Sequence, residues 1–165
     1  MPDLWLDDTR FMQIVRARPG DAARLTDIAF AAKRQWDYPE SWIESWRDAL
    51  TVRPEFIAGH ETYAAVLDAR PVGFYALGRG GDRMELLHLW VLPEAMGRGV
   101  GRSLFGHALE RARKAGCRVL EIESDPNAEG FYQHMGAHRV GARVKELEGQ
   151  RRELPILIFE IGPEA

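Results

Sequence analysis

The sequence predicts a mixed α/β fold, and three observations support this class. The first third is mostly helical after one short strand, whereas the last two thirds alternate between the periods of strands and helices. The 165 residues are close to the size of one average domain and too few for two well-cored domains. With 45% hydrophobic and 28% charged residues, the chain has enough apolar material to fold alone.

Local patterns place the elements of the first third. Residues 12–18 are typical of a strand, and Pro19 precedes a helix whose apolar residues are spaced three and four apart. Ser41 and Glu44 have the spacing of a capping box, which predicts that a second helix opens there. Pro54 is expected to close this helical region.

The remaining elements follow from turn residues and apolar periodicity. Three antiparallel strands in a meander are expected over residues 62–68, 72–77 and 84–92. Apolar residues from Val100 to Ala112 then fall on one helical face, and Gly116 ends that helix. A strand over 118–123, a short helix over 127–135 and strands over 137–146 and 154–161 complete the pattern.

Composition and charge exclude several classes of function. The 22 basic and 25 acidic residues give a net charge of −3, so neither nucleic acid nor anionic lipid is an expected partner. No apolar run approaches the roughly 18 to 20 residues of a membrane helix. The first residues, MPDLWLDD, lack the basic and apolar regions of an export signal, and Cys117 is a single cysteine expected in the core. A cytoplasmic location is therefore expected.

A glycine-rich loop, MGRGVGR, lies between an expected strand and the strongest expected helix. Its backbone N–H groups would point outward at the positive end of a helix, and the glycines let the main chain approach a phosphate. The alternative is a turn without a ligand. The spacing fits neither the dinucleotide fingerprint, because Arg102 stands three after Gly99, nor a Walker loop, because Met96 stands five before Gly101.

Two stretches, LHLWVLPEAMGRGVGRSL and NAEGFYQHMGA, resemble the acetyl-CoA core of the GCN5-related N-acetyltransferase superfamily. The resemblance implies one N-acetyltransferase domain over residues 14–161, with residues 1–13 as an N-terminal extension. It also implies a mostly antiparallel twisted sheet, with a parallel central pair splayed for the cofactor and about four flanking helices. The implied reaction moves acetyl from acetyl-CoA to a primary amine by direct attack in a ternary complex.

The same resemblance assigns the cofactor contacts. It places the pyrophosphate on Gly97, Arg98, Gly99, Val100, Gly101 and Arg102, and the pantetheine arm along the backbone of Leu89, Trp90 and Val91. Asn127 falls where the family often places an amide that touches the cofactor. Met96 stands where the family usually has Gln or Arg, which removes one contact from a site made mainly of backbone N–H groups.

Acetyl transfer to an amine needs a base, because a lysine-like amine is neutral only about once in 10³ to 10⁴ molecules at pH 7. Glu85 matches the position of the general base in protein-lysine members of the family, and burial would raise its pKa into a useful range. His88, Glu121 and Glu123 are alternatives. A solvent-facing carboxylate at a strand end is the competing interpretation of Glu85.

Tyr132 stands where the family places a tyrosine that protonates the departing thiolate. A phenol with a reference pKa near 10 stays protonated at pH 7 and can donate to a thiol of pKa about 8.5. The competing interpretation is core packing, since the residues at helical spacing around Tyr132 form an apolar face. A backbone N–H on the strand from Leu87 to Val91 would meet the oxyanion.

The acceptor is expected to bind in the first third of the chain, which is rich in aromatic and acidic residues. Those residues are Trp36, Tyr38, Trp42 and Trp46 together with Glu40, Glu44 and Asp48. Aromatic walls and carboxylates suit a cationic amine, although packing on the sheet and a solvated helix face explain the same pattern. A small-molecule amine or a protein amino group fits.

Three further expectations complete the hypothesis. The five histidines and the cysteine show no metal-ligand spacing, so no metal is implied. A homodimer is compatible with the resemblance. The competing class of function is a non-catalytic acetyl-CoA-binding or regulatory module, which Glu85 and Tyr132 argue against.

Overall fold

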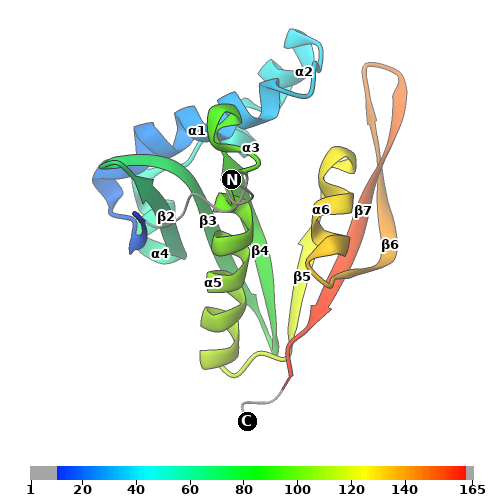
Figure 1. Ribbon diagram of the computed structural model, residues 1–165. Coiled ribbons are helices and arrows are strands. Elements are labelled where there is room, and N and C mark those ends of the chain that lie inside the picture. Colours follow the sequence, from blue (N-terminus) through cyan, green and yellow to red (C-terminus); the bar gives the residue numbers. More distant parts are fainter. Residues whose placement is uncertain (1–10, 163–165) are drawn as a thin grey trace, which may run out of the picture. The chain divides into compact units, whose positions relative to one another are not determined.

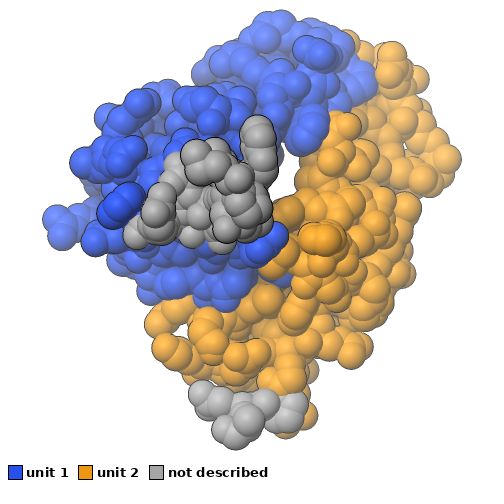
Figure 2. All heavy atoms as spheres, in the orientation of Figure 1, with its two compact units in different colours: residues 1–77, 88–108 blue, residues 78–87, 109–165 orange. Residues whose placement is uncertain are grey.

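The computed structural model describes residues 11–162, and these form two compact units (Figure 2). Among the described residues, unit 1 holds residues 11–77 and 88–108, and unit 2 holds residues 78–87 and 109–162. Strands β3 (Arg70–Gly80) and β4 (Arg83–Val91) contribute residues to both units. Most of the extension expected over residues 1–13 lies outside the described part of the chain.

A seven-stranded sheet with the order β1-β2-β3-β4-β5-β7-β6 is formed by the described residues (Figure 1). The other strands are β1 (Met12–Arg16), β2 (Glu61–Leu67), β5 (Val119–Glu123), β6 (His138–Leu147) and β7 (Gln150–Glu160). β4 pairs with β5 in parallel, whereas β1–β2, β2–β3, β5–β7 and β6–β7 are antiparallel pairs. The predicted mixed α/β class with a mostly antiparallel sheet and a parallel central pair is confirmed.

Six α-helices accompany the sheet within residues 11–162, where about four were expected. They are α1 (Ala22–Arg34), α2 (Glu40–Ser45), α3 (Arg47–Leu50), α4 (Pro54–Gly59), α5 (Val100–Lys114) and α6 (Glu129–His134). Short 3-10 helices at Pro19–Asp21, Pro93–Ala95 and Pro126–Ala128 each begin with a proline. None of the helices described here has both the length and the apolar character that a bilayer crossing requires.

The helical segment after α1 differs from its prediction in two ways. Ser41 is the second residue of α2 and not its N-cap, because the helix begins at Glu40. Glu44 bonds to the Arg47 side chain in place of the expected capping interaction. Pro54 does not end the region but begins α4, where its fixed φ and missing N–H suit a first helical position.

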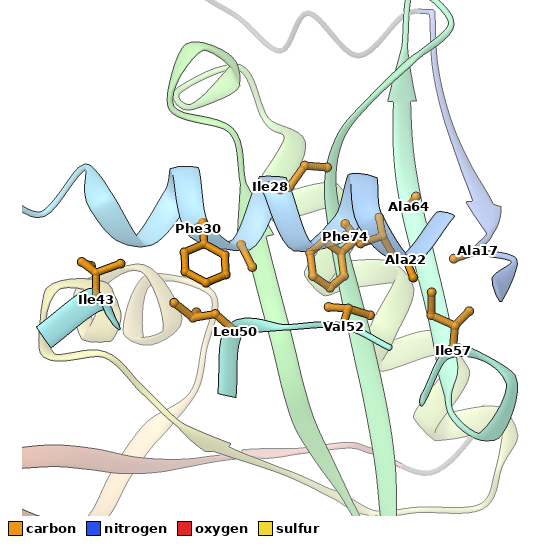
Figure 3. Close-up of a cluster of buried hydrophobic side chains, with 12 residues drawn as sticks. Ala17, Ala22, Ile28, Phe30, Ile43, Leu50, Val52, Ile57, Ala64 and Phe74 are labelled. Atoms are coloured by element: carbon orange, nitrogen blue, oxygen red, sulfur yellow. The ribbon is translucent and has the colours of Figure 1, made fainter. Parts of the chain in front are cut away.

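The core of unit 1 is built from the apolar face of α1 and the segments that follow it (Figure 3). Leu25 and Ile28 of α1 are at most 1% exposed and pack with Phe74 of β3. The connection after α3 is held to α1 by the Thr26 hydroxyl, which donates to the carbonyl of Val52 and accepts from its N–H. This packing holds the helical segment from α2 to α4 against α1.

Unit 2 contains the parallel strand pair and a long hairpin. Met84 and Leu86 of β4 pair in register with Leu120 and Ile122 of β5, and all four side chains are buried. β5 also pairs with β7, which forms a hairpin with β6 (Figure 1). The residues at alternate positions of β4 and β5 therefore face away from this core.

Gly73 of β3 makes a close approach that no side chain would allow. A Cβ there would lie 2.9 Å from the Trp90 carbonyl oxygen and 3.1 Å from Leu104 Cδ1 of α5. We expect Gly73→Ala to lower the free energy of unfolding by about 1–3 kcal/mol, the range for overpacking. Urea denaturation measures this change.

The matched control for this variant is Gly106→Ala in the middle of α5. A Cβ at Gly106 meets nothing within 4 Å. Removing a glycine from a helix interior should stabilise the protein by about 0.5–1 kcal/mol. A Gly73→Ala protein as stable as the wild type would contradict the close approach.

Candidate functional site

Two glycines of the loop before α5 have left-handed backbone conformations, which glycine adopts more readily than other residues. Gly97 has φ 76° and Gly99 has φ 83°, and a Cβ built on Gly97 meets nothing within 4 Å. The Ser103 N–H donates to the Gly99 carbonyl and closes the first turn of α5. The N–H groups of residues 100–102 therefore have no acceptor within the helix, so the start of α5 suits an anion.

The positions flanking this loop agree with a binding site on the backbone. Arg102 is exposed and Arg98 is half-buried, so both can lie at the rim. Met96, which replaces the Gln or Arg of the family, is 37% exposed, and its N–H donates to the Pro93 carbonyl. The departure at Met96 thus leaves the glycine turns intact.

The last residues of β4 extend beyond its pairing with β5. β4 is nine residues long and β5 five, and the paired residues are Arg83–Leu86 with Val119–Ile122. The stretch Leu89–Val91, expected to meet the pantetheine arm, lies beyond the part of β4 that pairs with β5. Its side chains are half-buried or buried, as the ordinary packing interpretation requires, while its backbone is the part that the hypothesis assigns to a ligand.

The aromatic cluster expected to receive a cationic acceptor already holds a cation of the protein itself. Lys33 of α1 is only 8% exposed, and its Nζ lies 4.3 Å from the ring centroid of Trp46 and 5.1 Å from that of Tyr38. The Trp90 ring centroid is 5.9 Å away. Sequence reasoning missed Lys33, although it follows the buried Ala32 on α1.

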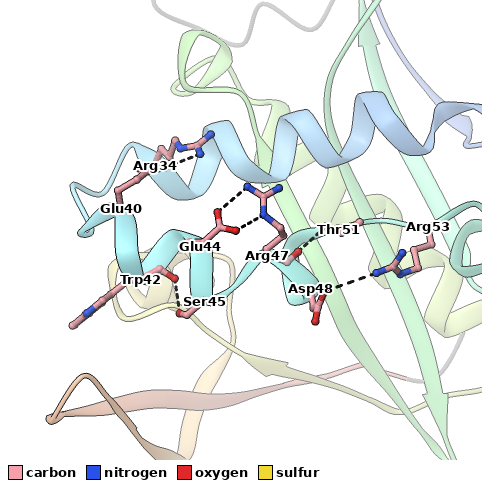
Figure 4. A network of polar contacts seen from close by, with 9 residues as sticks. All are labelled: Arg34, Glu40, Trp42, Glu44, Ser45, Arg47, Asp48, Thr51 and Arg53. Carbon is pink, nitrogen blue, oxygen red and sulfur yellow. Dashed lines mark hydrogen bonds and ion pairs between the residues drawn. The ribbon is translucent and has the colours of Figure 1, made fainter.

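Each acid of the expected acceptor region is paired with an arginine (Figure 4). The Glu40–Arg34 and Glu44–Arg47 pairs have N–O distances of 2.8 Å, and the Asp48–Arg53 pair has 3.8 Å. The hydrogen bond from Arg47 lowers the pKa of Glu44. These carboxylates are ion-paired side chains at the surface of unit 1 in this structure.

His88 lies on the same face of β4 as Trp90 and is held by it. The Trp90 Nε1–H donates to His88 Nδ1 at 3.0 Å, and the rings of Phe56 and Phe74 pack against the imidazole. Burial lowers the pKa of His88 to about 4, and the neighbouring His60 adds to this effect. His88 is therefore neutral at pH 7.

The three acidic candidates for the base lie in unit 2. Glu85 is exposed, so the burial expected to tune its pKa is not found. Glu121 lies 3.6 Å from Arg83, and Glu123 is paired with two basic residues of β6, Arg143 and Lys145. The strand register places Glu85 beside Glu121, with both side chains on the face opposite the core of unit 2.

Tyr132 is buried on α6. Its burial raises its pKa above the ordinary value, and the charge of Asp125 adds to this effect. The phenol is therefore protonated at neutral pH and carries a hydrogen that it can donate. Asn127, the expected cofactor amide, is exposed, and its backbone N–H and side-chain amide both donate to the Asp125 carboxylate.

Two expected absences concern metal and disulfide chemistry. Cys117 is 2% exposed and a free thiol, in agreement with its expected place in the core. Within residues 11–162, no cluster of three or more His, Cys, Asp or Glu side chains forms a metal site. The candidate functional residues thus divide into the α5 loop, the end of β4 and His88 in unit 1, and Glu85, Asn127 and Tyr132 in unit 2.

The chain is similar to known acetyltransferases. The model of the acetyltransferase (GNAT) family matches residues 25–137. The blasticidin-S acetyltransferase of Streptomyces morookaense is 37% identical over 98 residues, which cover 49% of this chain and 71% of that protein. The peptidyl-lysine N-acetyltransferase YiaC of Escherichia coli (strain K12) is 28% identical over 107 residues, covering 64% and 69% of the two chains.

A solved structure supports the fold. The PaiA N-acetyltransferase of Thermoplasma acidophilum, in complex with coenzyme A, matches with a TM-score of 0.69 and 22% identity. The match covers 90% of this chain and 98% of that one.

Proposed function

The chain belongs to the acetyltransferase (GNAT) family, and from this premise we propose that it transfers acetyl from acetyl-CoA to a primary amine. The observation that carries the proposal is the pair of left-handed glycines that open α5. They leave the N–H groups at the start of a helix unpaired, where a pyrophosphate is stabilised by backbone donors and the helix dipole. Arg98 and Arg102 add positive charge at the rim.

The cofactor is the acetyl donor, and two observations support it. Coenzyme A occupies the PaiA structure that shares this fold, and the blasticidin-S relative is named as an acetyltransferase. The backbone of Leu89, Trp90 and Val91 would bind the pantetheine arm as an added strand. Asn127 is proposed to contact the cofactor with its side-chain amide, whose NH₂ group already donates one hydrogen bond to Asp125. A cytoplasmic location is part of the proposal.

We propose first that the acceptor is an amine of a small molecule, because the relative that is 37% identical is named a blasticidin-S acetyltransferase. A protein lysine is the second candidate, favoured by the likeness to a peptidyl-lysine N-acetyltransferase. Transfer of radiolabelled acetyl to a panel of small amines and lysine peptides, with acetyl-CoA affinity measured in parallel, tests the proposal. Cofactor binding without transfer to any amine would favour the non-catalytic module.

Direct attack within a ternary complex follows from the side chains available. The one thiol, Cys117, is buried and so is not placed to carry an acetyl group. Glu85 is the proposed base and would remove the ammonium proton, directly or through water. Tyr132 would donate its phenolic hydrogen to the sulfur as the thiolate leaves, and its burial keeps that hydrogen in place at neutral pH.

Replacing Gly99 by valine should weaken acetyl-CoA binding. A β-branched residue both resists φ 83° and blocks the approach of a phosphate to the backbone. We expect the dissociation constant to rise at least tenfold, which is about 1.4 kcal/mol. Isothermal titration measures it. Gly149→Val, at φ 78° in the β6–β7 turn, is the control for strain alone and should leave affinity unchanged.

Removing the Tyr132 hydroxyl should lower turnover with little change in cofactor affinity. Tyr132→Phe keeps the ring and its packing, so kcat should fall by roughly 10- to 10⁴-fold, the range for one general acid. Steady-state kinetics check this, with Tyr63→Phe of unit 1 as the control. Wild-type turnover in Tyr132→Phe would show that this tyrosine packs in the core and does not act as the acid.

Replacing Glu85 by glutamine should cost activity in a pH-dependent way. A base is needed most when the amine is protonated, so the loss should be largest near pH 7 and partly recovered at pH 9.5. A pH series of kcat/KM shows this, and Glu55→Gln, an exposed acid of α4, should match the wild type at both pH values. Equal losses of kcat/KM at both pH values would show that Glu85 is not the base.

A further inference from the structure

The bond between Trp90 and His88 determines which nitrogen of the imidazole carries the hydrogen. The Trp90 indole nitrogen is a donor only, and it lies 3.0 Å from His88 Nδ1. His88 Nδ1 must therefore present its lone pair. A neutral imidazole has one hydrogen, so that hydrogen is on Nε2.

The surroundings of His88 keep the ring neutral. Phe56 and Phe74 pack against it with ring centroids 5.4 Å and 5.7 Å away, and burial lowers its pKa to about 4. The neighbouring His60 favours the same state, because its charge would lower the pKa of His88 further. His60 Nδ1 is itself bonded to the Phe56 carbonyl.

These facts exclude His88 as a ready base in this arrangement. Its Nδ1 lone pair is engaged by Trp90, and its Nε2 already carries a hydrogen. A neutral imidazole of this kind instead offers one N–H donor, at Nε2.

We propose that His88 donates its Nε2–H to an oxygen of the acceptor substrate, and that Trp90 is the positioning residue that holds this tautomer. The proposal rests on the acetyl-transfer function above. It places the acceptor oxygen on the face of β4 that carries Trp90 and lies beside the aromatic cluster of Lys33, Tyr38 and Trp46. The substrate class that fits is an amine with a nearby carbonyl, hydroxyl or carboxylate oxygen, such as an amino-acid derivative, in preference to a plain alkylamine.

The tautomer is tested without any substrate. Nitrogen NMR of protein labelled with [¹⁵N]histidine distinguishes the two neutral tautomers and the cation. We expect the Nε2–H tautomer of His88 from pH 5 to pH 8 in the wild type, and loss of that single state in Trp90→Phe. A cation at pH 7, or the Nδ1–H tautomer in the wild type, would overturn the proposal.

Two substitutions separate a donor from a base. The amide NH₂ of His88→Gln lies near the place of Nε2 and can donate, but it cannot take a proton from an amine. His88→Leu offers neither. With phenylalaninamide as acceptor, we expect kcat/KM to fall at least about tenfold in His88→Leu, the size of one hydrogen bond, and to stay within about threefold in His88→Gln.

Matched substrates and a distant control complete the experiment. With 2-phenylethylamine, which lacks the oxygen, the two variants should react at equal rates, and His134→Gln on the exposed side of α6 should match the wild type throughout. Equal losses in His88→Gln and His88→Leu with phenylalaninamide would overturn the donor role. No transfer to any amine by the wild type would overturn the function itself, while the NMR result would still decide the tautomer.

Discussion

The Lys33 ammonium, buried among aromatic rings, links the end of α1 to the helical segment that follows it and to β4. One charge joins the end of α1 to Trp46, between α2 and α3, and to Trp90 of β4, with ring centroids 4.3 Å and 5.9 Å from Nζ. Removing an ammonium from water is costly, and ring faces attract a cation more strongly where water is excluded. The same packing holds Trp90 in the position from which its indole N–H orients His88.

This interaction changes the chemical character of the region that was expected from the sequence to receive the acceptor. Aromatic walls beside carboxylates would favour a cationic ligand, but here the rings surround a lysine, and the acids Glu40, Glu44 and Asp48 are paired with arginines. Under the proposal above, what unit 1 offers near the end of β4 is a hydrogen-bond donor on His88, whereas the Lys33 ammonium is already enclosed by rings. Such a surface is better suited to an oxygen-bearing amine than to a polyamine.

The proposed cofactor site is made mainly of backbone groups. The two left-handed glycines lie just before α5, and the replacement of the family's Gln or Arg by Met96 leaves their conformation in place. Strand β4 contributes both to the core of unit 2 and to the proposed cofactor site. Its first half pairs with β5 and fills the core of unit 2, and its last residues run past that strand, with backbone groups that the hypothesis assigns to pantetheine.

The fold and the glycine loop could be predicted from the sequence, because they rest on local patterns: apolar periods of strands and helices, the glycines of the α5 loop, and prolines at element ends. The family assignment, made from two short stretches, is confirmed by the match over residues 25–137. The same local rules misplaced the start of the second helix at Ser41: α2 begins at Glu40, directly after Pro39, and Glu44 bonds to the Arg47 side chain. Only the tertiary structure decided which side chains are buried and which residues they contact. Glu85 is exposed, Lys33 lies among aromatic rings, and the hydrogen bond from Trp90 determines which nitrogen of His88 carries the hydrogen. Burial and side-chain pairing join residues that are distant in the sequence, and the chemistry of His88 and Lys33 depends on those contacts and not on their own local pattern.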